Sequence, residues 1–187
     1  MSAPLDLQNI LQHSRCIFTA EEIEAALNRL ANSLQVALEH KNPIFLCAMN
    51  GALIFMGHLV TKLNFLLQMD YVHLKRYENN RPGESVEWLS SPHLSLKGRH
   101  VVIVEDILDS GLTLQAVEEY CYAQKAAQVY TLVLLDKPSG RMPGGLASAD
   151  FVGLTVKENL FLYGFGLDYD HYLRNLPAIY ALNEDFF

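Results

Sequence analysis

An acidic stretch follows an apolar run in VVIVEDILDSGLTL, residues 101–114, and its residue types could hold a charged ligand. Three carboxylates come first and three small or hydroxyl-bearing residues follow them: Glu105, Asp106, Asp109, Ser110, Gly111 and Thr113. Like charges this close repel one another, and burying them costs additional free energy. The stretch is therefore either a helix start with capping side chains or a site for cations and phosphate.

The residues alone leave both interpretations open. Asp109 or Ser110 could be an ordinary N-cap, which accounts for one acceptor but not for three carboxylates. In a phosphate site, Gly111 would let successive backbone N–H groups point at an oxyanion, and the hydroxyls of Ser110 and Thr113 would add donors. Glu105 and the acid beside it would then face ribose hydroxyls or hydrated Mg²⁺, which suits carboxylate and phosphate oxygens. The stretch matches neither the P-loop nor the Rossmann pattern.

Helices and strands must position this stretch, and the hydrophobic pattern predicts that they alternate. Residues 19–40 have apolar side chains at helical spacing, and Thr19 with Glu22 forms a capping box at their start. We expect further helices at 51–63 and 112–125. Short apolar runs predict strands at 43–49, 66–74, 100–107, 128–135 and 150–156.

This alternation predicts a single α/β domain, residues 1–187, with an open, mostly parallel sheet flanked by helices. Such sheets bind ligands at the carboxyl ends of their strands, and the acidic stretch follows a strand that we expect to end near Val104. Residues 76–87 are polar and lack apolar periodicity, which predicts a long mobile loop. A loop rich in Gly and Pro, 136–145, precedes the last predicted strand, and the aromatic-rich tail 160–176 mixes strand and turn signals.

Composition and charge exclude several classes of protein. The 187 residues suffice for one domain with a full core, and the net charge of −7 disfavours non-specific binding to nucleic acid or acidic lipid. Cys16, Cys47 and Cys121 are scattered, which argues against a disulfide scaffold or a zinc site and fits a reducing compartment. There is no signal-peptide pattern and no apolar run long enough for a bilayer. We expect a cytoplasmic protein without membrane or nucleic-acid partners.

The order of motifs resembles a known family. Two acids after an apolar strand, two apolar residues and then Asp-Ser-Gly-x-Thr are similar to the 5-phosphoribosyl-1-pyrophosphate (PRPP) motif of type I phosphoribosyltransferases. Lys137, the DFVGL run and the 160–176 tail follow in the order of the hypoxanthine-guanine members. The resemblance covers about residues 15–176 and implies the type I phosphoribosyltransferase fold. It also implies a small hood built from about residues 1–20 and 157–187.

The resemblance implies roles for four residues around a purine. Asp109 would be the general base at N7 of the purine, and Lys137 would donate a hydrogen bond to the 6-oxo group, which adenine lacks. Phe161 would stack on the purine, and the backbone of Leu162 would contact the edge of the ring. A surface lysine and apolar core residues are the alternative interpretations of these positions.

On the phosphate side, the resemblance implies a Mg²⁺ cofactor, whose ligands would be Glu105, Asp106 and Asp168. The contacts to PRPP and pyrophosphate would come from Asn50, Gly51, Tyr77, Ser110, Gly111, Leu112 (through its backbone), Thr113 and Arg174. Tyr77 lies in the 76–87 loop, which matches the mobile catalytic loop of the family. This chain has Asn50 where many members carry Lys or Arg, and Leu160 where a basic residue is common. Both departures remove positive charge from the expected site.

The reaction that the resemblance implies is a step of purine salvage. The phosphoribosyl group of PRPP would move to N9 of hypoxanthine or guanine, giving IMP or GMP and pyrophosphate. The alternatives are a transferase for xanthine or a pyrimidine, and a non-catalytic regulator that senses PRPP or nucleotide. The acidic net charge disfavours the basic face that such a regulator usually carries. The family further implies a homodimer or homotetramer, whereas the choice between hypoxanthine and guanine stays open.

Overall fold

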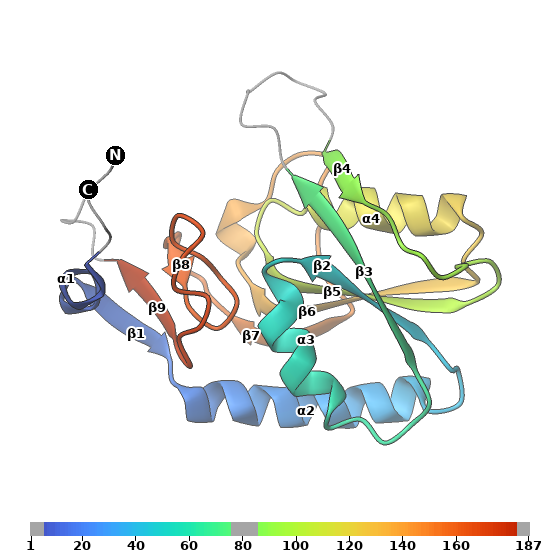
Figure 1. Cartoon of the computed structure of the whole chain (residues 1–187), viewed down its shortest axis with the longest axis horizontal. Coiled ribbons are helices and arrows are strands. Elements are labelled where there is room, and N and C mark those ends of the chain that lie inside the picture. Colours follow the sequence, from blue (N-terminus) through green and yellow to red (C-terminus); the bar gives the residue numbers. More distant parts are fainter. Residues whose placement is uncertain (1–5, 76–85, 183–187) are drawn as a thin grey trace.

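A central sheet of six strands organises the computed structural model, which describes residues 6–75 and 86–182. The strands are β2 (Ile44–Met49), β3 (Gln68–Lys75), β4 (Glu87–Ser90), β5 (His100–Leu108), β6 (Gln128–Asp136) and β7 (Phe151–Thr155). Their order in the sheet is β4-β3-β2-β5-β6-β7. All neighbouring pairs are parallel except β3 and β4, which are antiparallel. The prediction of an open, mostly parallel sheet is confirmed (Figure 1).

Helices cover both faces of this sheet. The helices are α2 (Ala20–Leu38), α3 (Ala52–Val60) and α4 (Leu112–Ala123). In β5, Val102 and Val104 pack with α2 and α3, whereas Val101 and Ile103 pack with α4. Successive side chains of a strand point to opposite faces, so a strand covered on both sides needs a continuous apolar run. This requirement explains the run of valines that precedes the acidic stretch.

The predicted capping box at the start of α2 is present. The Glu22 amide donates to Thr19 Oγ1 over 3.3 Å, and the Thr19 amide donates to Glu22 Oε2 over 2.9 Å. These two bonds satisfy donors that a helix start would otherwise leave unpaired. The helix predicted at 51–63 ends earlier than expected, at Val60.

Two expectations about the acidic stretch are wrong. Strand β5 ends at Leu108, one residue beyond the predicted 100–107 strand, so the expectation that it ends near Val104 is wrong; its backbone stays paired with β6 as far as Asp136. Glu105 and its acidic neighbour therefore lie within the strand. The N-cap of α4 is Gly111 rather than Asp109 or Ser110, although Ser110 Oγ accepts from the amide of Leu112, the first residue of the helix, over 3.4 Å.

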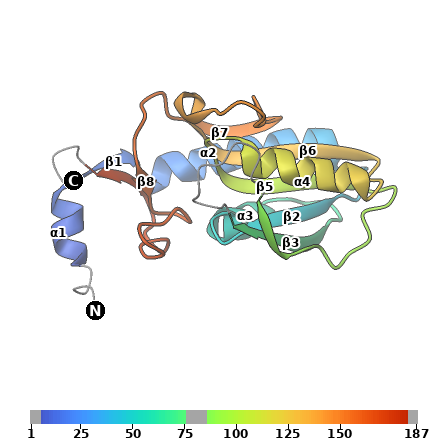
Figure 2. The same cartoon turned by 90° about the horizontal axis from the view of Figure 1, so that it is seen from above.

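A second, smaller sheet lies at one end of the molecule (Figures 1 and 2). It is antiparallel, in the order β1-β9-β8, and α1 precedes it in the chain. Its elements are α1 (Leu7–Gln12), β1 (Ser14–Phe18), β8 (Leu162–Tyr163) and β9 (Ile179–Leu182). The hydroxyl of buried Tyr163 donates to Ser14 Oγ over 2.7 Å and links the two ends of the chain. The division of the chain into one domain with a hood stays a prediction, although these elements come from the segments expected to form it.

The structure bears on two further expectations, which concern membrane-spanning segments and disulfide bonds. None of the helices in the described ranges 6–75 and 86–182 is long and apolar enough to cross a membrane. The three cysteines are free thiols, and burial raises the pKa of both Cys47 and Cys121 to about 12.

Candidate active site

A polar cavity of about 240 Å³ opens between the carboxyl ends of β2 and β5. These strands are neighbours, but the chain leaves β2 toward β3 and leaves β5 toward β6, in opposite directions along the sheet. Open α/β sheets bind ligands at such a switch point. The cavity brings together ten of the predicted site residues: Asn50, Gly51, Glu105, Asp106, Asp109, Ser110, Gly111, Thr113, Asp168 and Arg174.

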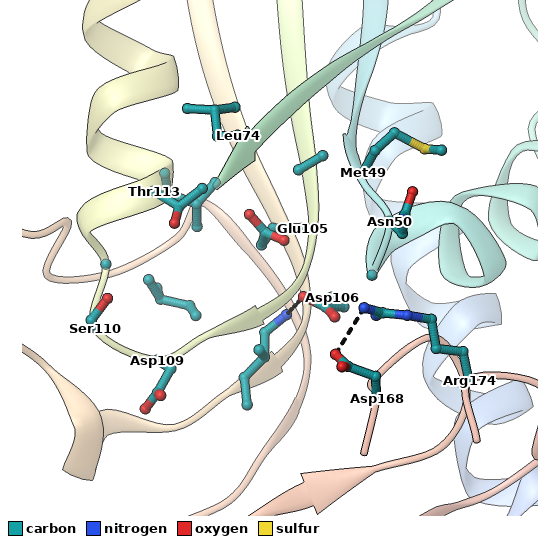
Figure 3. Close-up of a pocket in the computed structure, with 16 residues that line it drawn as sticks. Met49, Asn50, Leu74, Glu105, Asp106, Asp109, Ser110, Thr113, Asp168 and Arg174 are labelled. Carbon is teal, nitrogen blue, oxygen red and sulfur yellow. Dashed lines mark hydrogen bonds and ion pairs between the residues drawn. The ribbon is translucent and has the colours of Figure 1, made fainter. Parts of the chain in front are cut away.

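The predicted phosphate loop wraps one side of the cavity and leads into α4 (Figure 3). Gly111 has φ +81°, and a Cβ at this position would lie 2.5 Å from the carbonyl oxygen of Leu146. The segment after β6 also holds this loop. The Met142 amide donates to the Ser110 carbonyl over 3.1 Å, and the Leu146 amide donates to the Gly111 carbonyl over 3.0 Å. A helix N-terminus whose first amides face a cavity is suited to bind phosphate.

Replacing Gly111 by Ala is expected to lower the free energy of unfolding by about 1–3 kcal/mol. Alanine disfavours the left-handed backbone, and its methyl group would overlap the Leu146 backbone. Gly57 is a matched control, because it lies in α3 and a methyl group added there would have no atom within 4 Å, so Gly57→Ala should stabilise by about 0.5–1 kcal/mol. Urea denaturation of both variants measures the difference, and equal effects would contradict this description of the loop.

The acid pair at the end of β5 forms the floor of the cavity. Asp106 is buried, with 8% of its surface exposed, and Gly51 lies directly against its carboxyl group. Burial raises the pKa of Asp106, although hydrogen bonds from Glu105 and the Ile107 amide and the charge of Arg174 act in the opposite direction. A raised pKa weakens the repulsion that the sequence implies, because it favours the uncharged form of one of the two neighbouring carboxyl groups.

Asp168 and Arg174 reach the cavity from the aromatic-rich tail and form an ion pair, with 2.8 Å between Arg174 Nη2 and Asp168 Oδ1 (Figure 3). Arg174 also donates to the Gly166 carbonyl over 2.6 Å, and Asp168 accepts from the His171 amide over 2.9 Å. The predicted metal ligand and the predicted pyrophosphate ligand are therefore partners of one another here.

The described residues contain no cluster of three or more His, Cys, Asp or Glu side chains that could hold a metal by themselves. The three predicted ligands thus do not form a closed metal cage. Mg²⁺ commonly takes only one or two carboxylates and completes its shell with waters and substrate phosphates. Glu105 and Asp106, adjacent at the floor of a cavity suited to phosphate, fit a shared site of this kind.

Asp109 lies where the phosphate loop meets the loop after β6. Lys137 Nζ is 3.1 Å from Asp109 Oδ1 and also donates to the Leu160 carbonyl over 3.3 Å. Only 9% of the Lys137 surface is exposed, so the interpretation as a surface lysine is wrong. Gly140 lies directly against the Asp109 carboxylate and leaves no room for a side chain. A buried ammonium group therefore faces the carboxylate that borders the cavity.

The remaining predicted residues within the described ranges lie outside the cavity lining. Lys137 reaches it only through Asp109, and Leu112 is the first residue of α4. Phe161 is 50% exposed and meets Tyr169 edge-on at 5.9 Å between ring centroids, whereas Leu162 is buried in β8. Tyr77 and most of the predicted 76–87 loop lie outside the described residues.

Three residues around this site were not predicted from the sequence. Gly140 and Arg141 belong to the loop rich in Gly and Pro, and Tyr169 belongs to the tail. The density of Gly and Pro directly after Lys137 was a signal that the backbone there packs closely against something. The structure identifies this neighbour as the phosphate loop, residues 109–111.

Comparison with known proteins identifies the family. The family model for the phosphoribosyl transferase domain matches residues 14–170, which include every element of the main sheet and the cavity lining up to Asp168. This chain belongs to the phosphoribosyltransferase family. The resemblance drawn from the acidic stretch is therefore confirmed.

Similar proteins indicate which members of the phosphoribosyltransferase family this chain belongs with. The chain is 36% identical over 169 residues to the hypoxanthine-guanine phosphoribosyltransferase of Bacillus subtilis, covering 90% of the chain and 92% of the relative. It is 33% identical over 183 residues to the bifunctional protein TilS/HprT of Listeria innocua, covering 97% of the chain but only 27% of that longer protein. A crystal structure of a hypoxanthine phosphoribosyltransferase from Staphylococcus aureus matches with TM-score 0.86 and 27% identity, covering 92% and 93% of the two chains. The phosphoribosyltransferase thus belongs with the hypoxanthine-guanine members and has their fold.

Proposed function

We propose that this phosphoribosyltransferase moves the phosphoribosyl group of PRPP to N9 of hypoxanthine or guanine, giving IMP or GMP and pyrophosphate. The observation that most strongly supports this proposal is the Asp109–Lys137 ion pair at the edge of the phosphate cavity. It supplies a proton acceptor and a buried hydrogen-bond donor side by side, next to a loop suited to a sugar phosphate. Membership of the hypoxanthine-guanine group supports the same reaction.

In the proposed reaction, breaking the bond between C1 and pyrophosphate builds positive charge on the ribose and negative charge on the leaving group. Arg174 and backbone donors near Gly51 would stabilise the leaving group. Asp109 would take or share the proton at N7, which makes N9 the better nucleophile. Arg174 already lines the cavity, and its guanidinium group has five N–H donors, so it could contact the pyrophosphate while paired with Asp168.

We propose Mg²⁺ as the cofactor, held by Glu105, Asp106 and Asp168. When bound, this ion would supply positive charge to the PRPP hydroxyl and phosphate oxygens. Binding of Mg²⁺ requires ionisation of the Asp106 carboxyl group, because a metal binds the deprotonated form. Burial raises the pKa of Asp106 and so opposes this step, whereas the nearby charge of Arg174 favours it.

Lys137 is the proposed determinant of the purine. Its ammonium group can donate to a 6-oxo oxygen, whereas the 6-amino group of adenine is no acceptor and would set N–H groups against a buried positive charge. Phe161, half-exposed beside Tyr169, offers a ring face for the base, and the backbone of Leu162 would follow its edge.

The test is an assay of pyrophosphate release with PRPP, Mg²⁺ and one base at a time. Hypoxanthine and guanine should support turnover, and adenine should have a kcat/KM about 10⁴-fold lower, as expected where a site is built to bond a missing group. Chelating Mg²⁺ should abolish turnover with every base. Xanthine and the pyrimidines test the alternative transferases, and binding of PRPP without release from any base would instead favour the regulator.

The oligomeric state, the compartment and the 76–87 loop are also matters of proposal. We propose a cytoplasmic homodimer or homotetramer without nucleic-acid or membrane partners, as the resemblance and the net charge of −7 imply. Tyr77 and the 76–87 loop are proposed to close over the substrates, which would keep water from the ribose centre.

A further inference from the structure

One arginine of the loop after β6 makes an unusually large set of contacts to the backbone around the site. Arg141 Nη1 donates to the carbonyls of Leu108, Asp109 (2.7 Å) and Lys137 (3.1 Å). Its Nη2 forms an ion pair with the Asp136 carboxylate, and its Nε donates to the Ala147 carbonyl over 3.1 Å. The Arg141 side chain is 18% exposed, so water can reach little of it.

These contacts join the two segments that carry the proposed base and the proposed purine donor. Asp109 follows β5, and Lys137 follows β6, one position beyond the last paired residues of the two strands. One guanidinium group bonds the backbone of both residues, and the Lys137 amide donates to the Leu108 carbonyl over 3.0 Å, so these bonds together set the separation of the two main chains. The 3.1 Å contact between their side chains depends on that separation.

The phosphate side of the loop is held by other groups. The carbonyls of Ser110 and Gly111 accept from the amides of Met142 and Leu146, and Gly111 then begins α4. Arg141 donates to neither of these carbonyls. Its contacts therefore concern the purine side of the site rather than the phosphate side.

We propose that Arg141 is a positioning residue, which holds Asp109 and Lys137 at the spacing that purine binding and proton transfer require. This inference rests on the function proposed above. A misplacement of about 1 Å in a catalytic group can cost on the order of 10²-fold in rate. Lysine cannot replace Arg141, since a single ammonium nitrogen cannot reach three carbonyls, a carboxylate and a fourth carbonyl on opposite sides.

The experiment compares Arg141→Lys and Arg141→Ala with the parent enzyme, using purified full chain. We expect kcat with hypoxanthine to fall about 10-fold in Arg141→Lys and about 100-fold in Arg141→Ala. The KM for hypoxanthine should rise, and the KM for PRPP should stay within about threefold. Adding guanidinium at millimolar concentration should restore part of the activity of Arg141→Ala, because the free ion can occupy the vacated donor position.

Arg99 provides a matched control. Its guanidinium donates to Gln68 Oε1 over 2.6 Å and to the Asn42 carbonyl over 2.8 Å, at the amino ends of the strands, away from the cavity. Arg99→Ala should lower the Tm without changing either KM, and guanidinium should not raise its activity. A general loss of stability would thus be separated from a loss of positioning.

The outcomes distinguish this inference from the proposed function. A parent enzyme that releases no pyrophosphate with any base would contradict the proposed function itself. An active parent, with Arg141→Lys matching it in kcat and in both KM values, would overturn the role of Arg141 alone. Equal rises in the KM values for hypoxanthine and PRPP, with no recovery of activity on adding guanidinium, would also overturn it, since they would indicate a structural role. If Arg141→Ala does not fold, Arg141→Lys decides by the same comparison of kcat and KM.

Discussion

Asp109→Asn is expected to lower kcat by about 10²–10⁴-fold, the usual contribution of a general base. Asparagine has nearly the same shape, so its amide oxygen can occupy the position of Asp109 Oδ1, 3.1 Å from Lys137 Nζ, and the packing against Gly140 should survive. What is lost is the ability to accept the proton from N7. Steady-state kinetics with hypoxanthine measure kcat, and titration with PRPP measures binding.

A general base should affect kcat much more than it affects PRPP binding, so the two measurements are compared. PRPP binding should stay within about threefold of the parent, because Asp109 is not among the groups proposed to hold the phosphate. Glu119→Gln is the control, since this carboxylate bonds Gln115 on the exposed side of α4 and should leave kcat unchanged. If Asp109→Asn weakened PRPP binding as much as it lowered kcat, the base role would have to be abandoned.

Lys137→Met is expected to lower kcat/KM for hypoxanthine by about 30-fold or more, and to remove most of the preference over adenine. Removing one partner of a buried charged hydrogen bond costs about 2–5 kcal/mol. Methionine matches the lysine side chain up to Cε, so the change removes the donor and its charge while most of the buried volume stays filled. The loss for adenine should be smaller, because adenine cannot accept this bond.

The measurement is the ratio of kcat/KM for hypoxanthine to that for adenine, in the parent and in the variant. Lys97→Met is the control, because Lys97 is an exposed lysine outside the cavity lining. The control should preserve the ratio. A Lys137→Met enzyme with the parental ratio would show that the 6-oxo group is recognised by another residue.

The sequence by itself determined the features that depend on neighbouring residues. The 3.6-residue period and the Thr19–Glu22 box specify α2, and the continuous apolar runs specify strands covered on both faces. The acidic stretch could be interpreted as a phosphate loop because its glycine, hydroxyls and carboxylates follow one another directly. These signals are local, so a pattern over a few residues carries them.

Only the tertiary structure decided which groups meet. Strand β5 runs on to Leu108 because β6 supplies paired backbone as far as Asp136, which no pattern within β5 reveals. Pairing of β1 with β9 joins Ser14 to Leu182 from opposite ends of the chain. Such contacts depend on hydrogen-bond partners far away in sequence, and short strands carry little periodicity of their own.

The partners of the charged groups were decided in the same way. Arg174 could be expected to bind pyrophosphate, but its pairing with Asp168 follows from how the tail folds back on the cavity. Arg141 gave no local signal, because its partners are carbonyl groups, which every residue has. Sequence patterns specify side-chain types, whereas the positions of backbone carbonyls arise only when two strand ends are brought together. The site therefore combines a loop that the sequence encodes locally with supports that exist only in the folded chain.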